Sequence, residues 1–227
     1  MKILKLPQCE ISAAPSCENL FIAGGRAPDS DWLKTVAQGR KIFGVDKGIE
    51  ICRACNLLPE ILIGDFDSAE SSAVAWAVEK NIPIERHPVD KDLTDTQLAL
   101  KFADSAAILT GIFGGRFDHA FSTIFTCANF PARIILADER EIIFFVKGGE
   151  SFDVEFFIRP LAVSLLPMSG ICSGVTIKNM RWELDNATLN QNFPNAVSNR
   201  IASPKIKISV GSGTLAVYFC FSELISA

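Results

Sequence analysis

The stretch that decides the fold is KIFGVDKGIEICRACNLLPEILIGDFDS, residues 41–68. Two short apolar runs, residues 41–45 and 61–63, flank residues 49–58, whose apolar side chains recur with a helical period. Strand, helix and strand in this order are typical of a parallel sheet covered by helices. Acidic residues follow both apolar runs, so the same stretch also indicates where a functional site lies.

The alternation of short apolar runs and helical segments extends over residues 19–146, with further predicted strands at residues 20–23, 106–109 and 133–136. The clearest helix is predicted at residues 117–130. The apolar side chains that recur along it, and that we expect to lie on the sheet, are Phe117, Phe121, Ile124, Phe125 and Ala128. The pattern predicts an α/β domain over residues 1–147.

After residue 147 the apolar side chains alternate with polar ones, which is the period of a half-buried strand. The alternating residues are Phe152, Val154 and Phe156, then Ile206, Ile208 and Val210, and finally Leu215, Val217 and Phe219. Short strands with one apolar face each need a second layer to bury it, so residues 148–227 are predicted to form an all-β sandwich.

Composition excludes several classes of protein. The chain is 48% hydrophobic and 21% charged, as is ordinary for a globular protein. Its net charge of -4 and the lack of clustered Lys and Arg argue against a nucleic-acid partner. No apolar run approaches the roughly 20 residues that cross a bilayer as a helix. Residues 1–10 lack the features of a secretory signal, so we expect a cytoplasmic protein without a membrane partner.

Seven cysteines are spread along the chain, and Cys52 and Cys55 form an isolated C-x-x-C. Without a second pair there is no four-sulfur zinc site, and the two residues share one face of the helix predicted at residues 49–58. Buried thiols are therefore favoured over a redox pair.

Aspartates follow several of the predicted strands. Asp46 follows the run 41–45, Asp65 and Asp67 follow the run 61–63, and Asp118 follows a glycine-rich turn after the run 106–109. Loops that leave parallel strands at their carboxyl ends open on one edge of the sheet, so these side chains should converge. Clustered carboxylates repel one another unless a cation neutralises them, and Mg²⁺ is the ion that best suits oxygen ligands beside phosphates.

Each aspartate also has an ordinary structural interpretation as a helix cap. Asp67 or Ser68 could cap a helix through residues 73–78, and Asp92 or Thr94 could cap one through residues 98–102. The two histidines, His87 and His119, lack partners at a metal-binding spacing, which disfavours a soft-metal site.

A second chemical element is GIFGGRFDH, residues 111–119. Glycines allow backbone N–H groups to approach phosphate oxygens, the following helix start favours an anion, and Arg116 adds a fixed charge. An ordinary glycine turn is the alternative. Neither of the common glycine signatures of nucleotide-binding loops is present.

In the β half, Trp182 is either core or a stacking surface, and Ser198 and Asn199 could be turn residues.

The chain resembles the thiamin pyrophosphokinases over nearly its whole length. The motifs that carry the resemblance are VDKG at 45–48, LLPEILIGDFDS at 57–68, KDLTD at 91–95, GGRFDH at 114–119, MRWEL at 180–184 and VSN at 197–199. The resemblance implies a Rossmann-like catalytic domain at residues 1–147, which binds ATP and Mg²⁺, and a thiamin-binding β-sandwich at residues 148–227. It also implies a homodimer in which each active site combines the catalytic domain of one subunit with the sandwich of the other.

The activity implied is transfer of the pyrophosphoryl group of ATP to the hydroxyl of thiamin, which gives thiamin diphosphate and AMP. The implied Mg²⁺ ligands are Asp65, Asp67 and Asp95, and the implied catalytic residues are Asp46, Asp92, Arg116 and Asp118. ATP would be bound by Asp46, Lys47, Gly48, Gly114, Gly115 and Arg116, and thiamin by Asp92, Asp118, Trp182, Ser198 and Asn199.

One departure from the family pattern is Lys47, which stands where relatives carry the middle glycine of D-G-G. We hypothesise that Lys47 supplements the nucleotide site; the alternative is a side chain that points into solvent. The proton acceptor is either Asp92 or Asp118. The rival functions are a pyrophosphokinase for another hydroxymethyl heterocycle such as a pterin, a non-catalytic thiamin or nucleotide sensor, and a redox protein.

Overall fold

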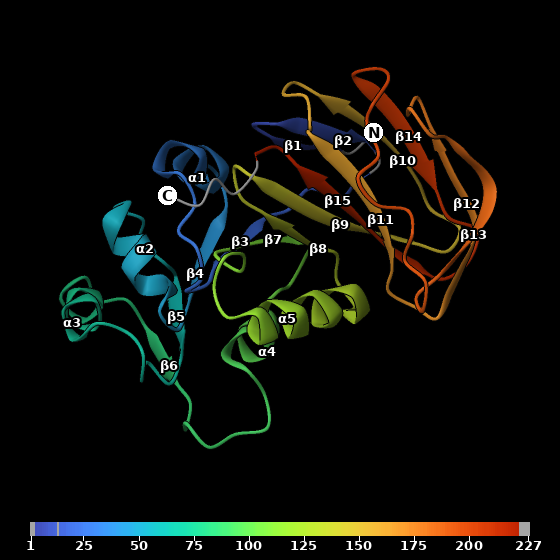
Figure 1. Cartoon of the computed structure of the whole chain (residues 1–227). Coiled ribbons are helices and arrows are strands. Elements are labelled where there is room, and N and C mark those ends of the chain that lie inside the picture. The colour runs from blue at the N-terminus through green and yellow to red at the C-terminus, as the bar shows by residue number, and fades with distance from the viewer. Residues whose placement is uncertain (1–2, 13, 223–227) are drawn as a thin grey trace. The chain divides into compact units, whose positions relative to one another are not determined.

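The structure is a computed structural model that describes residues 3–12 and 14–222 (Figure 1). Its contacts divide the chain into two compact units, one of residues 17–138 and one that combines residues 1–16 with residues 139–227. The outermost residues of both predicted domains, 1–2 and 223–227, lie outside the described residues. Among the residues that are described, no helix is long and apolar enough to cross a membrane.

The unit of residues 17–138 contains a parallel sheet in the order β8-β7-β3-β4-β5-β6. These strands are β3 (Asn19–Ile22), β4 (Lys41–Val45), β5 (Ile61–Gly64), β6 (Ile84–Arg86), β7 (Ala107–Thr110) and β8 (Ile134–Ala137). Every residue of β3, β7 and β8 is buried, as expected where helices cover both faces of a parallel sheet. The strands predicted at residues 20–23, 106–109 and 133–136 lie within one residue of β3, β7 and β8.

The helices of this unit are α1 (Ser30–Ala37), α2 (Gly48–Ala54), α3 (Ser71–Glu79), α4 (Asp95–Leu100) and α5 (Phe117–Asn129). Helix α4 begins with a capping box, in which the Thr94 side chain accepts a hydrogen bond from the Gln97 N–H and the Gln97 side chain bonds the Thr94 N–H. The capping interpretation is thus correct for Thr94. It is wrong for Asp67 and Ser68, because α3 starts after Glu70 without a side-chain cap.

The predicted buried face of α5 is wrong for Phe117 and Phe121, whereas Ala128 is buried as expected. Phe117 and Phe121 are 79% and 52% exposed, and the other buried residues of the helix are Thr123 and Cys127. The aromatic rings instead contact one another along the helix, with centroids 5.7 Å apart for Phe117 and Phe121. The apolar period identifies the helix, but the large side chains near its start are exposed, and the side chains of α5 that are buried are small.

The second unit is built from antiparallel strands. One sheet has the order β1-β2-β10-β14-β12-β13, and β11, β15 and β9 pair in that order. The strands are β1 (Ile3–Leu6), β2 (Cys9–Ser12), β9 (Glu141–Lys147), β10 (Ser151–Phe156), β11 (Ala162–Pro167), β12 (Ile171–Lys178), β13 (Leu184–Asn190), β14 (Lys205–Ser209) and β15 (Thr214–Cys220). Aromatic contacts connect the two sets of strands: the ring of Phe144 lies 5.9 Å from that of Phe152, and Phe156 lies 4.9 Å from Phe219.

This β unit differs from the continuous span 148–227 that the sequence predicts. Strand β2 pairs with β10, with Ile11 opposite Val154, and β9 pairs with β15, with Phe144 opposite Val217. Residues 1–16 and 139–147 are therefore part of the β unit. Alternation of apolar residues identifies a strand, but the partner of that strand is chosen by hydrogen bonds to residues far away in sequence.

Candidate active site

A cavity of about 620 Å³ lies in the unit of residues 17–138. It is lined by the loops that follow β3, β4, β5 and β7, together with the segment before α4 and the first turns of α5. These loops leave the carboxyl ends of the parallel strands, which is the edge where open α/β sheets bind ligands. The predicted site residues that line the cavity are Asp46, Lys47, Asp65, Asp67, Asp92, Asp95, Gly115 and Arg116.

Three carboxylates meet in this cavity. One side-chain oxygen of each of Asp46, Asp65 and Asp67 lies within 4.8 Å of the others. Asp46 directly follows β4 with a φ of 46°, a left-handed conformation that is uncommon outside glycine. The Asp46 N–H donates to the carbonyl of Ile63 at 2.9 Å, which holds the turn after β4 against β5. Backbone strain of this kind is concentrated at functional sites.

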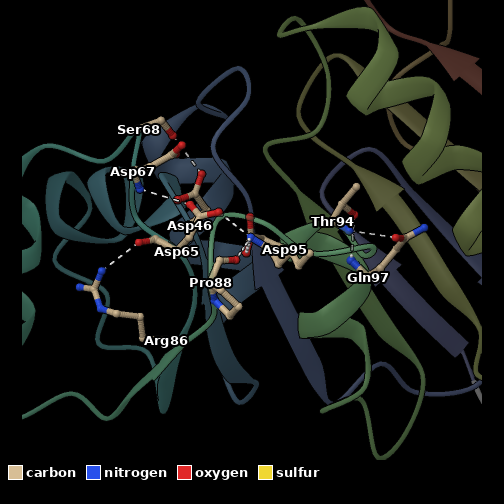
Figure 2. A network of polar contacts seen from close by, with 10 residues as sticks. Asp46, Asp65, Asp67, Ser68, Arg86, Pro88, Thr94, Asp95 and Gln97 are labelled. Carbon is tan, nitrogen blue, oxygen red and sulfur yellow. Dashed lines mark hydrogen bonds and ion pairs between the residues drawn. The ribbon is translucent and has the colours of Figure 1, made fainter.

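Neighbouring groups orient these carboxylates, as Figure 2 shows. The Ser68 hydroxyl donates to Oδ2 of Asp46 at 3.0 Å, and the Asp67 N–H donates to Oδ1 of Asp65 at 3.2 Å. The Arg86 guanidinium donates to the backbone carbonyl of Asp65 at 2.9 Å. Within the described part of the chain, Oδ1 of Asp46 is buried and accepts no hydrogen bond. An acceptor of this kind beside two further carboxylates fits a hard divalent cation such as Mg²⁺.

A lysine lies beside the carboxylates. The Nζ atom of Lys91 is 2.5 Å from Oδ2 of Asp65 and 3.3 Å from Oδ1 of Asp95, and it donates to the carbonyl of Pro88 at 3.0 Å. The side chains of Lys91 and Asp65 are only 13% and 9% exposed. Lys91 is not among the residues predicted from the sequence, although its place inside the acidic motif KDLTD was a signal for such a role.

This arrangement shifts the pKa values of the groups involved. Burial acts to raise the pKa of Asp65, but hydrogen bonds from Lys91 and from the Asp67 backbone hold it below its ordinary value. Burial acts to lower the pKa of Lys91, and its bond to Asp65 and the charge of Asp95 hold it above its ordinary value. The pKa of Asp95 is raised, first by burial and then by the charge of Asp65. Asp95 lies outside the close group of three carboxylates.

Arg116 and Asp118 form a two-pronged ion pair on the surface. Nε and Nη2 of Arg116 lie 3.1 and 2.6 Å from the two oxygens of Asp118, and both side chains are more than 60% exposed. The hydrogen bond from Arg116 lowers the pKa of the Asp118 carboxyl. Arg116 lines the cavity and Asp118 does not.

Several glycines line the cavity. Two of them, Gly24 and Gly25, were not predicted as site residues, although they follow the strand predicted at residues 20–23. The Gly25 N–H donates to the carbonyl of Gly111 at 2.6 Å. Gly111 has a φ of 70°, and a Cβ atom there would lie 2.1 Å from the Ala23 carbonyl oxygen. The loops after β3 and β7 therefore touch through their backbones.

The other glycines of the prediction and Lys47 have distinct places. Gly48 does not line the cavity; a Cβ atom on it would lie 1.9 Å from the carbonyl oxygen of Ile22, so its role is close packing of α2 on β3. Gly114 is also absent from the lining and lies against Arg26. Lys47 lines the cavity, half exposed, with Nζ 3.9 Å from Glu50.

The remaining predicted residues lie in the β unit. Trp182 is 55% exposed, so the interpretation of this residue as core is wrong. Ser198 has a φ of 58°, and its N–H donates to the Ser164 hydroxyl at 3.1 Å. The Asn199 side chain makes hydrogen bonds to the backbone of Trp182.

The C-x-x-C pair is unsuited to redox chemistry. Cys52 and Cys55 are buried free thiols. Burial, and next to it the neighbouring Cys55, raises the pKa of the Cys52 thiol to about 12, and the thiolate is the reactive form. This supports the interpretation as buried thiols.

The parallel sheet, with a carboxylate cluster and glycine-rich loops at one edge, defines an α/β protein of the phosphotransferase class. The chain belongs to the thiamin pyrophosphokinase family. The model of the thiamin pyrophosphokinase catalytic domain matches residues 33–136, and the model of the vitamin B1 binding domain of the same family matches residues 161–215.

Individual relatives agree with this assignment. The thiamine pyrophosphokinase of Bacillus subtilis is 27% identical over 181 residues, which are 76% of this chain and 84% of the relative. Thiamine pyrophosphokinase 1 of rice is 25% identical over 68% of this chain and 63% of its own length. In structure, the chain is similar to the Bacillus subtilis enzyme, with a TM-score of 0.79, 23% identity, and coverage of 90% of this chain and 99% of that one. It is similar to thiamin pyrophosphokinase from Candida albicans, with a TM-score of 0.76, 14% identity and coverage of 91% and 89%.

Proposed function

We propose that this protein is a thiamine diphosphokinase, which transfers the pyrophosphoryl group of ATP to the hydroxyl of thiamin and releases AMP. The observation that carries the proposal is the meeting of Asp46, Asp65 and Asp67 within 4.8 Å, in a protein of this family. The cavity beside them has the size of a small-molecule site and is lined by glycines that expose backbone groups to a ligand.

For the nucleotide side of the site, we assign Mg²⁺ to Asp46, Asp65 and Asp67, with Asp95 at the margin of the cluster, held by Lys91. When bound, Mg²⁺ neutralises charge on phosphate oxygens. Gly24, Gly25 and Gly115 offer backbone close to the phosphates, and Lys47 supplies a further positive charge from the cavity wall. If Lys47→Gly leaves the apparent affinity for ATP unchanged, the role of Lys47 is refuted.

The transfer forms a bond between the thiamin oxygen and the β-phosphorus and breaks the bond from that phosphorus to the oxygen that leaves with AMP. The main work of the protein in such a step is positioning and charge stabilisation. Arg116 lines the cavity and stabilises the charge on the transferring oxygens. We propose that Asp92 accepts the proton of the thiamin hydroxyl, because Asp92 lines the cavity, whereas Asp118 accepts hydrogen bonds from Arg116.

For the acceptor side, we assign thiamin to the β unit, with Trp182 as the stacking surface. An exposed indole suits a flat, cationic heterocycle. In line with the family resemblance, we propose a homodimer in which the cavity of one subunit is completed by the β unit of the other. The unit of residues 17–138 is then the Rossmann-like catalytic domain, and the β unit is a thiamin-binding sandwich.

The test is to incubate the protein with Mg²⁺, ATP and thiamin and to quantify AMP and thiamin diphosphate by chromatography. We expect both products in equal amounts, and none with Asp65→Asn. A hydroxymethyl pterin in place of thiamin is the matched acceptor control. Product from the pterin alone would establish the rival pyrophosphokinase, and absence of AMP with either acceptor would refute both transfer reactions and favour a sensor.

A further inference from the structure

The backbone of Trp182 is held by a side chain from a distant segment. The Trp182 N–H donates to Oδ1 of Asn199 at 3.2 Å, and Nδ2 of Asn199 donates to the Trp182 carbonyl at 2.6 Å. The amide group of Asn199 thus pairs with both backbone polar groups of Trp182, 17 residues away in sequence. This pair imitates the two hydrogen bonds that residues exchange in an antiparallel ladder.

Asn199 is itself fixed to the sheet. Its N–H donates to the carbonyl of Val163 in β11 at 2.9 Å, and its carbonyl accepts from the Val163 N–H at 2.8 Å. The Arg200 N–H also donates to Oδ1 of Asn199 at 2.8 Å. Oδ1 therefore accepts two hydrogen bonds, which is its full capacity, and it is not free to accept one from a ligand. A direct contact between Asn199 and thiamin, which the family resemblance implies, would therefore have to use another atom of Asn199.

The indole ring of Trp182 has a partner on one face. The guanidinium carbon of Arg181 lies 4.6 Å from the ring centroid, within the range of a cation–π contact. The Arg181 N–H donates to the carbonyl of Arg200 at 2.8 Å, so the backbone of Arg181 is tied to the residue that follows Asn199. Even with this contact, Trp182 is 55% exposed. The ring keeps an accessible surface for a flat ligand.

We propose that Asn199 and Arg181 are positioning residues that hold Trp182 ready for the acceptor heterocycle: Asn199 fixes the Trp182 backbone to β11, and Arg181 covers one face of the indole. The role in acceptor binding rests on the proposed function. The positioning of Trp182 by Asn199 and Arg181 does not depend on that function, because it follows from the contacts among these three residues. Pre-organisation of an aromatic surface strengthens binding by reducing the entropy lost when the ligand docks.

The first experiment examines Trp182 without ligand. The full-length protein is labelled with 5-fluorotryptophan, and the signals of its three tryptophans are separated by ¹⁹F NMR, with Trp182→Phe assigning one of them. Asn199→Ala removes both hydrogen bonds to Trp182. Asn199→Asp keeps the acceptor but replaces the donor beside the Trp182 carbonyl with a negative charge. We expect the Trp182 signal to shift or broaden in both variants while the other two signals, from Trp32 and Trp76, stay in place.

The second experiment measures steady-state kinetics with thiamin. We expect the Asn199 variants and Arg181→Ala to raise the KM for thiamin about tenfold and to change kcat by less than about twofold, because a less ordered Trp182 weakens binding of the ground state and the transition state alike. Arg181→Lys keeps a cation and should restore most of the affinity. The matched control is Asn195→Ala, at an exposed asparagine four positions from Asn199, which should alter neither the NMR signal nor the KM.

The outcomes separate the two proposals. An unchanged Trp182 signal in both Asn199 variants overturns the inference whether or not the enzyme uses thiamin. A changed signal with an unchanged KM for thiamin overturns the role in acceptor binding. If wild-type protein does not turn over thiamin while the signal still moves, the proposed function fails and the hold on Trp182 stands. If Asn199→Ala does not fold, the inference is tested with Asn199→Asp and with the two variants Arg181→Ala and Arg181→Lys.

Discussion

The Nζ atom of Lys91 lies 2.5 Å from the Oδ2 atom of Asp65. The same ammonium group is 3.3 Å from Oδ1 of Asp95, so one lysine bridges two acidic residues beside the proposed Mg²⁺ site. Asp65 also belongs to the group of three carboxylates formed with Asp46 and Asp67. Lys91 therefore offsets part of the repulsion that these carboxylates exert on one another when no metal ion is bound.

Lys91→Met should destabilise the metal-free protein. Removing one partner of a largely buried ion pair leaves an uncompensated charge, and we expect a loss of about 3 kcal/mol in the free energy of unfolding. Lys41→Met is the matched control, because Lys41 and Asp104 form a 2.9 Å pair that is about half exposed, and loss of an exposed ion pair should change stability far less. Urea denaturation in EDTA measures both. Added Mg²⁺ should narrow the deficit of Lys91→Met; equal losses in the two variants would refute the role of Lys91.

The stability difference between wild type and Lys91→Met should depend on pH. The pKa of Asp65 is lowered in the folded protein, so its contribution is present above about pH 4 and is lost as the pH falls through the lower folded value. The pKa of Lys91 is raised, so its contribution is complete below about pH 10 and is lost as the pH rises through the higher folded value. In thermal melts, the stability difference between the two proteins should be constant near neutral pH and should decrease toward both acid and alkaline pH. A difference that grows toward acid pH would contradict this assignment.

Asp46→Asn should weaken Mg²⁺ binding more than Ser68→Ala, which removes the hydroxyl that donates to Asp46. The change removes one of the three clustered carboxylates and should lower kcat/KM about a hundredfold. Ser68→Ala removes only the 3.0 Å hydrogen bond to Asp46 and should cost about fivefold. Calorimetric titration with Mg²⁺ and a nucleotide gives a readout that is independent of turnover. Similar Mg²⁺ affinities for Asp46→Asn and wild type would exclude Asp46 as a ligand.

If the active sites are shared between subunits, two inactive variants should restore activity when mixed. Asp67→Asn is defective in the cavity and Trp182→Ala in the β unit, so a mixed dimer has one site with both parts intact. Random exchange of subunits should return about a quarter of wild-type activity. The controls are each variant alone and a mixture of Asp65→Asn with Asp67→Asn, which share the same defective part. A mixture of Asp67→Asn and Trp182→Ala that stays as inactive as either variant would show that each site is built within one chain.

Substitutions on α5 should confirm which face of that helix meets the sheet. Phe121→Ser replaces an exposed ring and should change the free energy of unfolding by about 0.5 kcal/mol or less. Cys127→Leu adds volume to a buried position outside the predicted apolar face and should cost about 1–3 kcal/mol. The two variants can be compared by chemical denaturation. A larger loss for Phe121→Ser would mean that its ring is covered in solution.

The position of the cavity could be predicted from the sequence because it depends on chain direction alone. Apolar runs before Asp46 and Asp65 identify β4 and β5, and residues that follow parallel strands must emerge at one edge of the sheet. Which aspartates form the acidic cluster was harder to predict from the sequence than where the cavity lies. The family pattern suggested Asp65, Asp67 and Asp95, but the turn at Asp46 brings that carboxylate into the group, while Asp95 pairs with Lys91.

The amino-acid sequence by itself determined the parallel strands, the antiparallel character of the second half and the edge at which the aspartates gather, because periodicity and chain direction are local properties. Only the tertiary structure decided that β2 pairs with β10, that Phe117 and Phe121 of α5 are exposed while smaller side chains of the helix are buried, and that the amide of Asn199 pairs with the backbone of Trp182. Each of these depends on contacts between residues far apart in sequence. Their geometry follows from how side-chain volumes and hydrogen-bonding groups fit together once the whole chain has folded.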